Sequence, residues 1–205
     1  EQGVIEMLPM TYVRGRSIPN QLIAIDECFP YRQKVVTDKG NMMIGSLFNI
    51  YAKGLKLPKA RCLNLETKEF EYKEILSATY KGKKELVQVI AGSKKIKCTD
   101  NHPFLTVNKG WVKAKDLISG DCLVMSGEKN QKNNNWCNDY YKLPVNPVTK
   151  VVNLNQSDHV FDIEVADHHN FVACVGSNKS GFVVHNCQNI TGEEIKTLLT
   201  RAGVN

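Results

Sequence analysis

Val183-Val184-His185-Asn186-Cys187 places three reactive side chains in a row behind two β-branched residues. The side-chain amide nitrogen of Asn186 can attack its own main-chain carbonyl, which cuts the chain and leaves a cyclic imide. Histidine titrates near neutral pH, so His185 is suited to supply the proton that the leaving nitrogen needs. Cys187 then begins the downstream piece with a nucleophilic thiol. The stretch indicates chain cleavage; the alternative interpretation is a strand end followed by a polar turn.

The sequences on either side of residues 28–186 join into one pattern when that segment is removed. Residues 22–27 have the sequence LIAIDE, an apolar run ending in two acids, which is typical of a Walker B strand that holds a Mg²⁺-nucleotide. The chain resumes at residue 187 with CQNITGEEIK. The joined sequence resembles the Walker B region of PhoH-like P-loop ATPases. On this resemblance Asp26 and Glu27 serve the nucleotide chemistry of a host protein, and only after joining.

An insertion that begins with Cys28, ends with His185-Asn186 and is followed by Cys187 resembles an intein. Inteins are self-splicing elements that excise themselves and ligate their flanks, the exteins. The resemblance divides the chain into an N-extein segment, the intein and a C-extein segment, which are residues 1–27, 28–186 and 187–205. It implies an all-β Hint (Hedgehog/intein) fold, horseshoe-like and pseudo-twofold, that holds both splice sites side by side.

The interior of the insertion has the pattern of short strands and turns. Lys39-Gly40 and Lys109-Gly110 are each followed by an apolar residue four positions after the Gly and by Leu seven positions after it. This weak repeat predicts two similar halves. Hairpin turns are predicted at three places, and strands at two more. The turns are residues 66–68, 81–83 and 176–181, and the strands are residues 148–154 and 160–165.

Residues 126–150 change character, because they are rich in Asn and include Pro144 and Pro147. This composition predicts a linker. Since a homing endonuclease often occupies this place in inteins, the resemblance implies a mini-intein without endonuclease.

Two further motifs match the family and imply roles for their residues. Thr99-Asp100-Asn101-His102 matches a Thr-x-x-His motif, in which His102 protonates or twists the Glu27–Cys28 amide while Thr99 hydrogen-bonds nearby. Residues 160–171 match a block with an early Asp and a late His-Asn-Phe, which implies that Asp162 tunes the two thiols and His169 assists Asn186. The implied catalytic set is Cys28, Thr99, His102, Asp162, His169, His185, Asn186 and Cys187.

The chemistry implied by this set has four steps. The Cys28 thiol attacks the Glu27 carbonyl to give a thioester, and Cys187 then takes over the acyl group. Asn186 cyclises and releases the insertion, after which the new amine of Cys187 captures the acyl group in a peptide bond. A carboxylate beside a thiol raises the thiol pKa, so Asp162 is better suited to relay a proton than to stabilise a thiolate. His159 and His168 match no position of the motif and are interpreted as surface residues.

Two departures from the family pattern concern the junctions. Phe29-Pro30-Tyr31 is bulkier than the usual opening block, which bears on strain at the first scissile bond. The segment between Phe171 and Val183 is longer than usual, which bears on the placement of the second junction.

Composition bounds the remaining properties. Seven cysteines, an odd number without a C-x-x-C pair, argue against a disulfide scaffold and for a reducing, cytoplasmic setting. The net charge of +6 comes from scattered lysines, so neither nucleic acid nor membrane is an expected partner. No cofactor is expected, the substrate is the chain's own extein segments, and the element is expected to act as a monomer. A start at Glu1 rather than Met indicates a fragment of a longer precursor.

Other functions remain open at this point. Cys98, His102, His168 and His169 raise the possibility of zinc, but the paired short spacings of structural zinc sites are missing. A regulatory β module that is never excised, and an element that cleaves a single junction, are further alternatives. An active ATPase fragment is disfavoured because the sequence has no G-x-x-x-x-G-K-[ST] loop.

Overall fold

The computed structural model describes residues 27–127, 143–176 and 179–186. Within these residues the secondary structure is mostly β-sheet, as the sequence predicts. The strands are β1 (Phe29–Pro30), β2 (Lys34–Thr37), β3 (Gly40–Met43), β4 (Lys59–Leu63), β5 (Phe70–Ala91), β6 (Lys94–Cys98), β7 (Pro103–Thr106), β8 (Gly110–Lys113), β9 (Cys122–Ser126), β10 (Val145–Val165), β11 (Asn170–Cys174) and β12 (Gly181–His185). The helices are α1 (Ile44–Ala52) and the short 3₁₀ helix η2 (Ala114–Asp116).

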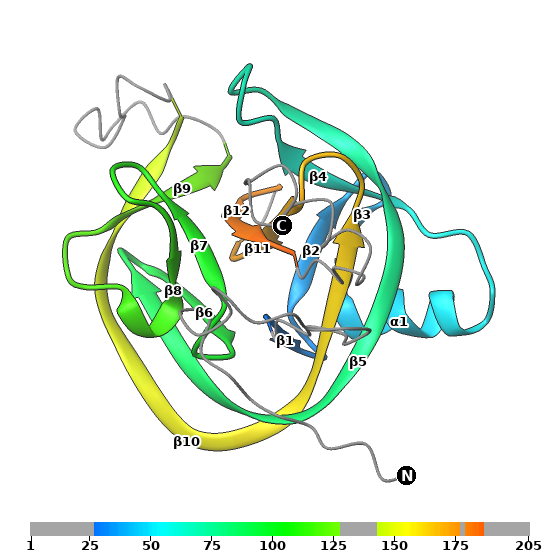
Figure 1. The fold of residues 1–205 in the computed structure, drawn as a ribbon, viewed down its shortest axis with the longest axis horizontal. Coiled ribbons are helices and arrows are strands. Elements are labelled where there is room, and N and C mark those ends of the chain that lie inside the picture. The colour runs from blue at the N-terminus through cyan, green and yellow to red at the C-terminus, as the bar shows by residue number, and fades with distance from the viewer. Residues whose placement is uncertain (1–26, 128–142, 177–178, 187–205) are drawn as a thin grey trace, which may run out of the picture. The chain divides into compact units, whose positions relative to one another are not determined.

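The two longest strands, β5 and β10, pair antiparallel along most of their length (Figure 1). Register shifts interrupt this ladder at four places, and one lies between His159 and Phe161. Such bulges bend a strand and increase its twist, which is how the two strands curve together around the others. The short strands β1 and β6 add to the outer edges of this pair, β1 on β10 and β6 on β5.

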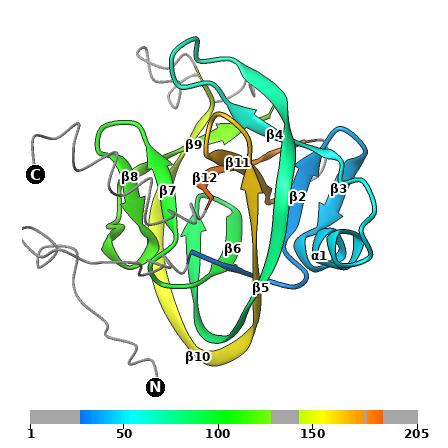
Figure 2. The ribbon, with the colours of Figure 1, turned by 45° about the vertical axis from the view of Figure 1, so that its right-hand side comes forward.

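The described residues form two similar halves, as the weak repeat predicts. In one half β2 pairs with β3 and with β4, and α1 follows; in the other β7 pairs with β8 and with β9, and η2 follows. Figure 2 shows the β2–β3 hairpin with α1 and the β7–β8 hairpin at opposite sides of the sheet. The strands β11 and β12 pair with each other between them, with β11 on β2 and β12 on β7.

The same hydrogen bonds recur in the two halves. The Thr37 hydroxyl donates to the Gly40 carbonyl (2.6 Å), and the Thr106 hydroxyl donates to the Gly110 carbonyl (2.8 Å). Both glycines have positive φ, 98° and 65°, which suits a residue without Cβ. Leu47 and Leu117, seven residues after each Gly, are both buried. The repeat therefore marks equivalent positions of two hairpins.

A main-chain pattern extends this equivalence to residues without sequence similarity. Ile44 donates its N–H to the Gln33 carbonyl and Ala114 donates to the His102 carbonyl, both at 2.8 Å. Gln33 and His102 therefore occupy corresponding positions directly before β2 and β7.

The core lies between the halves and is rich in phenylalanine. Phe29 meets Phe171 edge-on with ring centroids 6.0 Å apart, and Phe104 meets Phe182 in the same way at 6.2 Å. All four rings are fully buried, so the phenylalanines join β1, β7, β11 and β12 into one packed unit.

Two of the three predicted hairpins are confirmed and one is wrong. β4 and β5 pair across residues 64–69, and β11 and β12 pair across residues 175–180. Residues 81–83 form no hairpin, because β5 runs through them as one strand. Gly82, with φ of 86°, lies beside the bulge between His159 and Phe161 and bends the strand instead of reversing it.

The linker prediction is wrong at its upper end, and the two strands predicted after it form one strand. β10 begins at Val145, so residues 145–150 belong to the sheet despite Pro147, and β10 continues without a break across residues 155–159. The strand prediction failed at residues 155–159 because a register shift and a positive φ at Asn155 hide the alternation there. The Walker B strand predicted before Asp26 lies outside the described residues. No helix in the described part of the chain is long and apolar enough to cross a bilayer.

Gly181 permits close contact between β11 and β12. A Cβ at residue 181 would lie 2.3 Å from the Ala173 carbonyl oxygen, so the main chain itself must move. We expect Gly181→Ala to lower the free energy of unfolding by about 1–3 kcal/mol, measured by urea denaturation on a Cys28→Ala, Asn186→Ala background. Gly176→Ala is the matched control, because a Cβ there meets only the tip of Lys94 closely. Equal stability of the two variants would contradict this account.

Candidate active site

Cys28 lies directly before β1, and Thr99 hydrogen-bonds both its N–H and its carbonyl. The Cys28 N–H donates to Thr99 Oγ1 (3.0 Å), and the Thr99 N–H donates to the Cys28 carbonyl (3.0 Å). The Cys28 side chain is fully buried and packs with Leu86 and Val160. The threonine of the Thr-x-x-His motif thus holds the nitrogen of the Glu27–Cys28 bond.

His102 is fully buried beside the same peptide. Its ring lies 4.1 Å from that of Phe29, centroid to centroid. Burial and, to a smaller extent, nearby His185 lower the pKa of His102 to about 3, although the main chain of Glu27 acts in the opposite direction. His102 is therefore a neutral imidazole at physiological pH, which can donate one N–H but does not act as a cation.

Asn186 follows β12 and is also fully buried. Its N–H donates to the carbonyl of His169 (3.1 Å), whose φ of 49° turns the loop between β10 and β11 toward the junction. Among the described residues, neither atom of the Asn186 side-chain amide has a hydrogen-bond partner. Such an orphaned buried amide is rare in folded proteins.

Asp162 is buried in β10 and reaches the site through strand register. Phe29 pairs with Phe161 and Pro30 with Val160, so the same register continued by one residue sets Cys28 opposite Asp162. Directly opposed residues of an antiparallel pair point to the same face. Asp162 therefore shares a face with the Cys28 thiol.

The two junctions meet through Glu27 and His185. The Glu27 carboxylate, only 6% exposed as a residue, lies 3.3 Å from Nδ1 of His185 across 158 positions of sequence. The ring of His185 also meets the ring of Trp111, edge-on at 5.1 Å between centroids. Cys187 and Asp26 lie outside the described residues.

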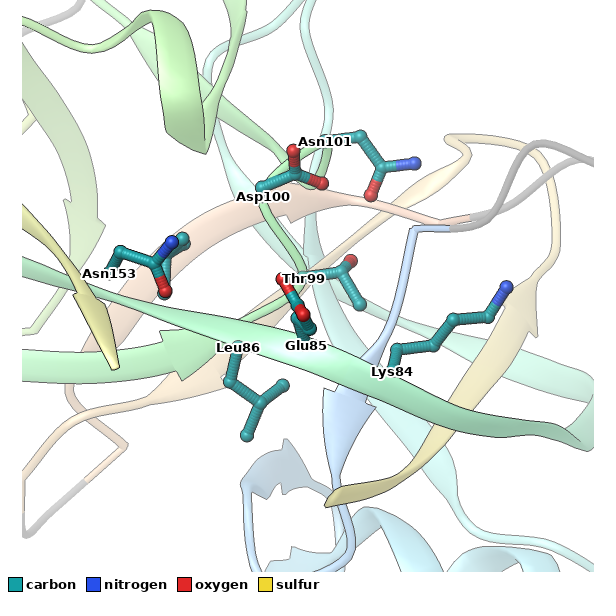
Figure 3. Close-up of a pocket in the computed structure, with 8 residues that line it drawn as sticks. Lys84, Glu85, Leu86, Thr99, Asp100, Asn101 and Asn153 are labelled. Carbon is teal, nitrogen blue, oxygen red and sulfur yellow. The ribbon is translucent and has the colours of Figure 1, made fainter. Parts of the chain in front are cut away.

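A polar pocket of about 270 Å³ opens beside Thr99. Figure 3 shows Asp100 and Asn101, on the loop after β6, across from Lys84 and Glu85 on β5. The pocket therefore borders the threonine that holds the Cys28 nitrogen, although Thr99 itself is buried. The described residues contain no group of three or more His, Cys, Asp and Glu side chains placed to hold a metal ion.

Two other cysteines of the described chain, Cys62 and Cys98, have thiols that stay protonated. Burial raises the pKa of Cys62 to about 12, with nearby Glu71 acting in the same direction. Burial also raises the pKa of Cys98 well above its ordinary value. Because the thiolate is the nucleophile, these cysteines are inert packing residues.

The two histidines that match no motif behave differently from each other. His159 is exposed and hydrogen-bonds the Tyr80 hydroxyl (2.7 Å), as expected for a surface residue. His168 is partly buried and not a plain surface residue as predicted, and its Nε2 hydrogen-bonds Glu71 (2.5 Å). This hydrogen bond joins the loop between β10 and β11 to β5. The Lys73–Asp167 ion pair (2.9 Å) joins the same two segments.

Sequence reasoning missed three contributors to the site. Asn170 bonds the main chain of Leu63 in both directions, which fixes the start of β11 next to His169. Trp111 and the side chain of Glu27 contact His185. Asn170 lies within the matched His-Asn-Phe block, which was a usable signal, whereas nothing in the sequence indicates the other two contacts.

Comparisons with known proteins agree with this geometry. Among protein-family models, the intein splicing domain matches residues 36–186. No curated protein sequence matches the chain significantly.

Several solved structures have a similar fold. The crystal structure of the Ssp DnaB mini-intein variant M86 has a TM-score of 0.63 at 19% identity, covering 80% of this chain and 97% of that one. The DnaX mini-intein of Spirulina platensis gives 0.57 at 25% identity, covering 78% of this chain and 100% of that one. The bacterial intein-like domain of Clostridium thermocellum gives 0.58 at 25%, with 78% and 99% covered. These matches confirm the expected Hint fold.

The buried His102 makes stability depend on pH. Its pKa falls from 6.5 to about 3 on folding, so between these values the unfolded chain binds the extra proton. Stability therefore falls as the pH drops below about 6.5. The measurement is the urea midpoint of unfolding at several pH values, on the Cys28→Ala, Asn186→Ala background. We expect acidification to lower this midpoint less in His102→Leu than in the parent. His159→Leu, at an exposed histidine, should follow the parent; an equal fall in all three proteins would contradict the assignment.

Proposed function

The chain belongs to the intein splicing domain family, whose activity is self-splicing, and we propose that residues 28–186 excise themselves and join Glu27 to Cys187. The observation that carries this proposal is the meeting of both junctions in one buried cluster. The Glu27 carboxylate lies 3.3 Å from the ring of His185, the residue before Asn186. Two bonds that must react in sequence are thereby held within one site.

The first proposed step is attack of the Cys28 thiol on the Glu27 carbonyl. A C–S bond forms, the C–N bond breaks, and the thiol proton ends on the freed nitrogen. The hydrogen bond from the Cys28 N–H to Thr99 holds this nitrogen, and the proximity of His102 to the Glu27 main chain supports a role as neutral N–H donor to the scissile amide. Asp162, opposite Cys28 in register, is assigned the proton relay for the thiol.

The remaining steps move the acyl group and release the insertion. The Cys187 thiol attacks the thioester, so that one C–S bond replaces another and Cys28 regains its thiol. The Asn186 side-chain nitrogen then attacks its own carbonyl, and the C–N bond to Cys187 breaks. His185 takes the proton that the attacking nitrogen loses and delivers a proton to the departing amine of Cys187. His169 supports this step by accepting the Asn186 N–H at its carbonyl. Finally the amine takes the acyl group from sulfur, which leaves a peptide bond.

The thioester is less stable than the amide, so the first step runs uphill. Cyclisation of Asn186 is irreversible, so it drives the earlier, uphill step toward products. Each chain reacts once, because the reaction consumes its own peptide bonds. Thiols must stay reduced for this chemistry, which supports a reducing compartment.

The proposed element is a mini-intein without endonuclease. β9 ends at Ser126 and β10 begins at Val145, and independently folded domains need roughly 50 residues or more. The intervening segment is too short for a nuclease domain. No nucleic acid enters any proposed step, and a single chain supplies every proposed catalytic group, so the element is proposed to act as a monomer.

Intact-mass spectrometry of freshly purified, reduced protein tests the proposal. We expect the 205-residue species to disappear while two products rise together. One spans residues 28–186, and the other joins residues 1–27 to residues 187–205. Asn186→Ala should prevent release of the insertion, and His102→Ala should slow formation of the thioester by about 10²-fold or more.

Other outcomes of this experiment separate the alternatives. Separate masses for residues 1–27 and 187–205 would mean cleavage without ligation. An unchanged full-length mass under reducing conditions would overturn splicing in favour of a module that is not excised. Glu66→Ala, at an exposed turn residue, is the control for purification and handling.

We further infer that the host is a PhoH-like ATPase whose Walker B region is interrupted by the insertion. The carboxylate of Glu27 is buried against His185 in the unspliced chain, which supports the inference that it is withheld from a Mg²⁺-nucleotide. Splicing is proposed to restore the Asp26-Glu27 turn beside residues 187–189.

We expect the full-length host carrying Cys28→Ala and Asn186→Ala to hydrolyse no ATP above background, whereas the spliced host does. The measurement is phosphate release at equal protein concentration. Hydrolysis by the unspliced host at the rate of the spliced host would refute the proposed activation.

A further inference from the structure

Glu27 belongs to the N-extein, yet its side chain lies inside the site. The residue is 6% exposed, and the partner that the structure gives its carboxylate is His185, at 3.3 Å. A buried carboxylate is costly unless a hydrogen bond or an opposite charge compensates it. Its inward position therefore depends on His185 as much as the orientation of His185 depends on it.

The contact involves one particular nitrogen of the His185 ring. Glu27 meets Nδ1, so Nε2, on the other side of the ring, is left for another partner. A carboxylate at one nitrogen sets the tautomer and the orientation of an imidazole, as the aspartate does in a Ser-His-Asp triad. Trp111, edge-on to the ring, limits its rotation from a second direction.

The position of Glu27 in the chain makes this contact unusual. The main chain of Glu27 lies beside His102, the donor proposed for the first junction, while its side chain contacts His185 at the second junction. One extein residue therefore touches the histidine of each cleavage step.

We infer that Glu27 is a positioning residue for His185 in the cleavage after Asn186, so that residue 27 determines which flanking sequences this intein accepts. The inference rests on the proposed function, because it assigns Glu27 to the Asn186 step. The host segment is then the substrate of the first step, and through Glu27 it also orients His185 for the cleavage after Asn186. Extein residues that place no acceptor at Nδ1 leave the ring of His185 held by Trp111 without the contact that sets its tautomer.

Cleavage after Asn186 is measured alone in the Cys28→Ala protein, which cannot form the first thioester. The readout is the rate at which residues 187–205 are released, by intact mass. We expect Glu27→Ala to slow this release by about 10-fold or more, since small misplacements of a reacting group cost up to about 10²-fold. Glu27→Gln keeps an acceptor oxygen in place and should stay within about 3-fold of the parent, because a neutral acceptor still orients the ring. Glu66→Ala, an exposed glutamate, should release at the parent rate.

A double-mutant cycle separates positioning from a general structural effect. If Glu27 acts through His185, Glu27→Ala causes no further slowing once His185→Ala is present. Equal slowing in both backgrounds would overturn the inference, as would equal rates for Glu27→Ala and the parent. Failure of the Cys28→Ala protein itself to release residues 187–205 would overturn the proposed Asn186 chemistry, and the inference with it.

Nitrogen NMR of the non-reacting Cys28→Ala, Asn186→Ala protein gives a readout that does not depend on rate. We expect neutral His185 to carry its proton on Nδ1, facing Glu27, and to shift toward the Nε2 tautomer in Glu27→Ala. An Nε2 tautomer in both proteins would overturn the assignment.

Discussion

The antiparallel ladder between β5 and β10 holds the reactive centre together. β1 pairs with β10 at Phe161 and Val160, and β6 pairs with β5 between Val87 and Ala91. Both short strands therefore belong to one hydrogen-bonded sheet, which lets the residue after β6, Thr99, bond the residue before β1, Cys28. A slip of one residue in this register would turn Asp162 to the opposite face from the thiol. Main-chain pairing therefore sets the positions of Cys28, Thr99 and Asp162 relative to one another.

The two halves show how one local structure serves different purposes. Gln33 and His102 occupy corresponding positions and accept equivalent main-chain hydrogen bonds. The Gln33 side chain donates to the carbonyls of Lys34 and Cys174, so it ties β2 to β11. His102 instead buries its ring against Phe29 and the scissile peptide. The same position of the two similar halves therefore holds a structural residue, Gln33, in one half and a proposed catalytic residue, His102, in the other.

Buried polar groups are concentrated where the proposed reaction occurs. The side-chain amide of Asn186 and Nδ1 of His169 have no hydrogen-bond partner among the described residues. Each such group costs about 1–3 kcal/mol. The phenylalanine core and the long β5–β10 ladder supply the stability that tolerates this cost. The same burial keeps His102 neutral, so it suits donation of a hydrogen bond but not storage of a proton.

The sequence by itself predicted the all-β Hint fold class and protein splicing as the general activity. His185-Asn186-Cys187, the Thr99–His102 motif and the Asp162–Phe171 block are local patterns whose residue types state what they can do, and the Lys-Gly repeat correctly indicated two halves. The continuous course of β5 and β10 was decided by tertiary structure, because bulges beside Gly82 and Asn155 break the alternation that marks a strand. Tertiary structure also decided the contacts of Glu27 and Trp111 with His185, since no spacing in sequence encodes a pairing across 158 residues. A motif can be recognised from residues that are close in sequence. Burial and long-range strand register depend on the whole folded sheet, so local sequence does not predict them.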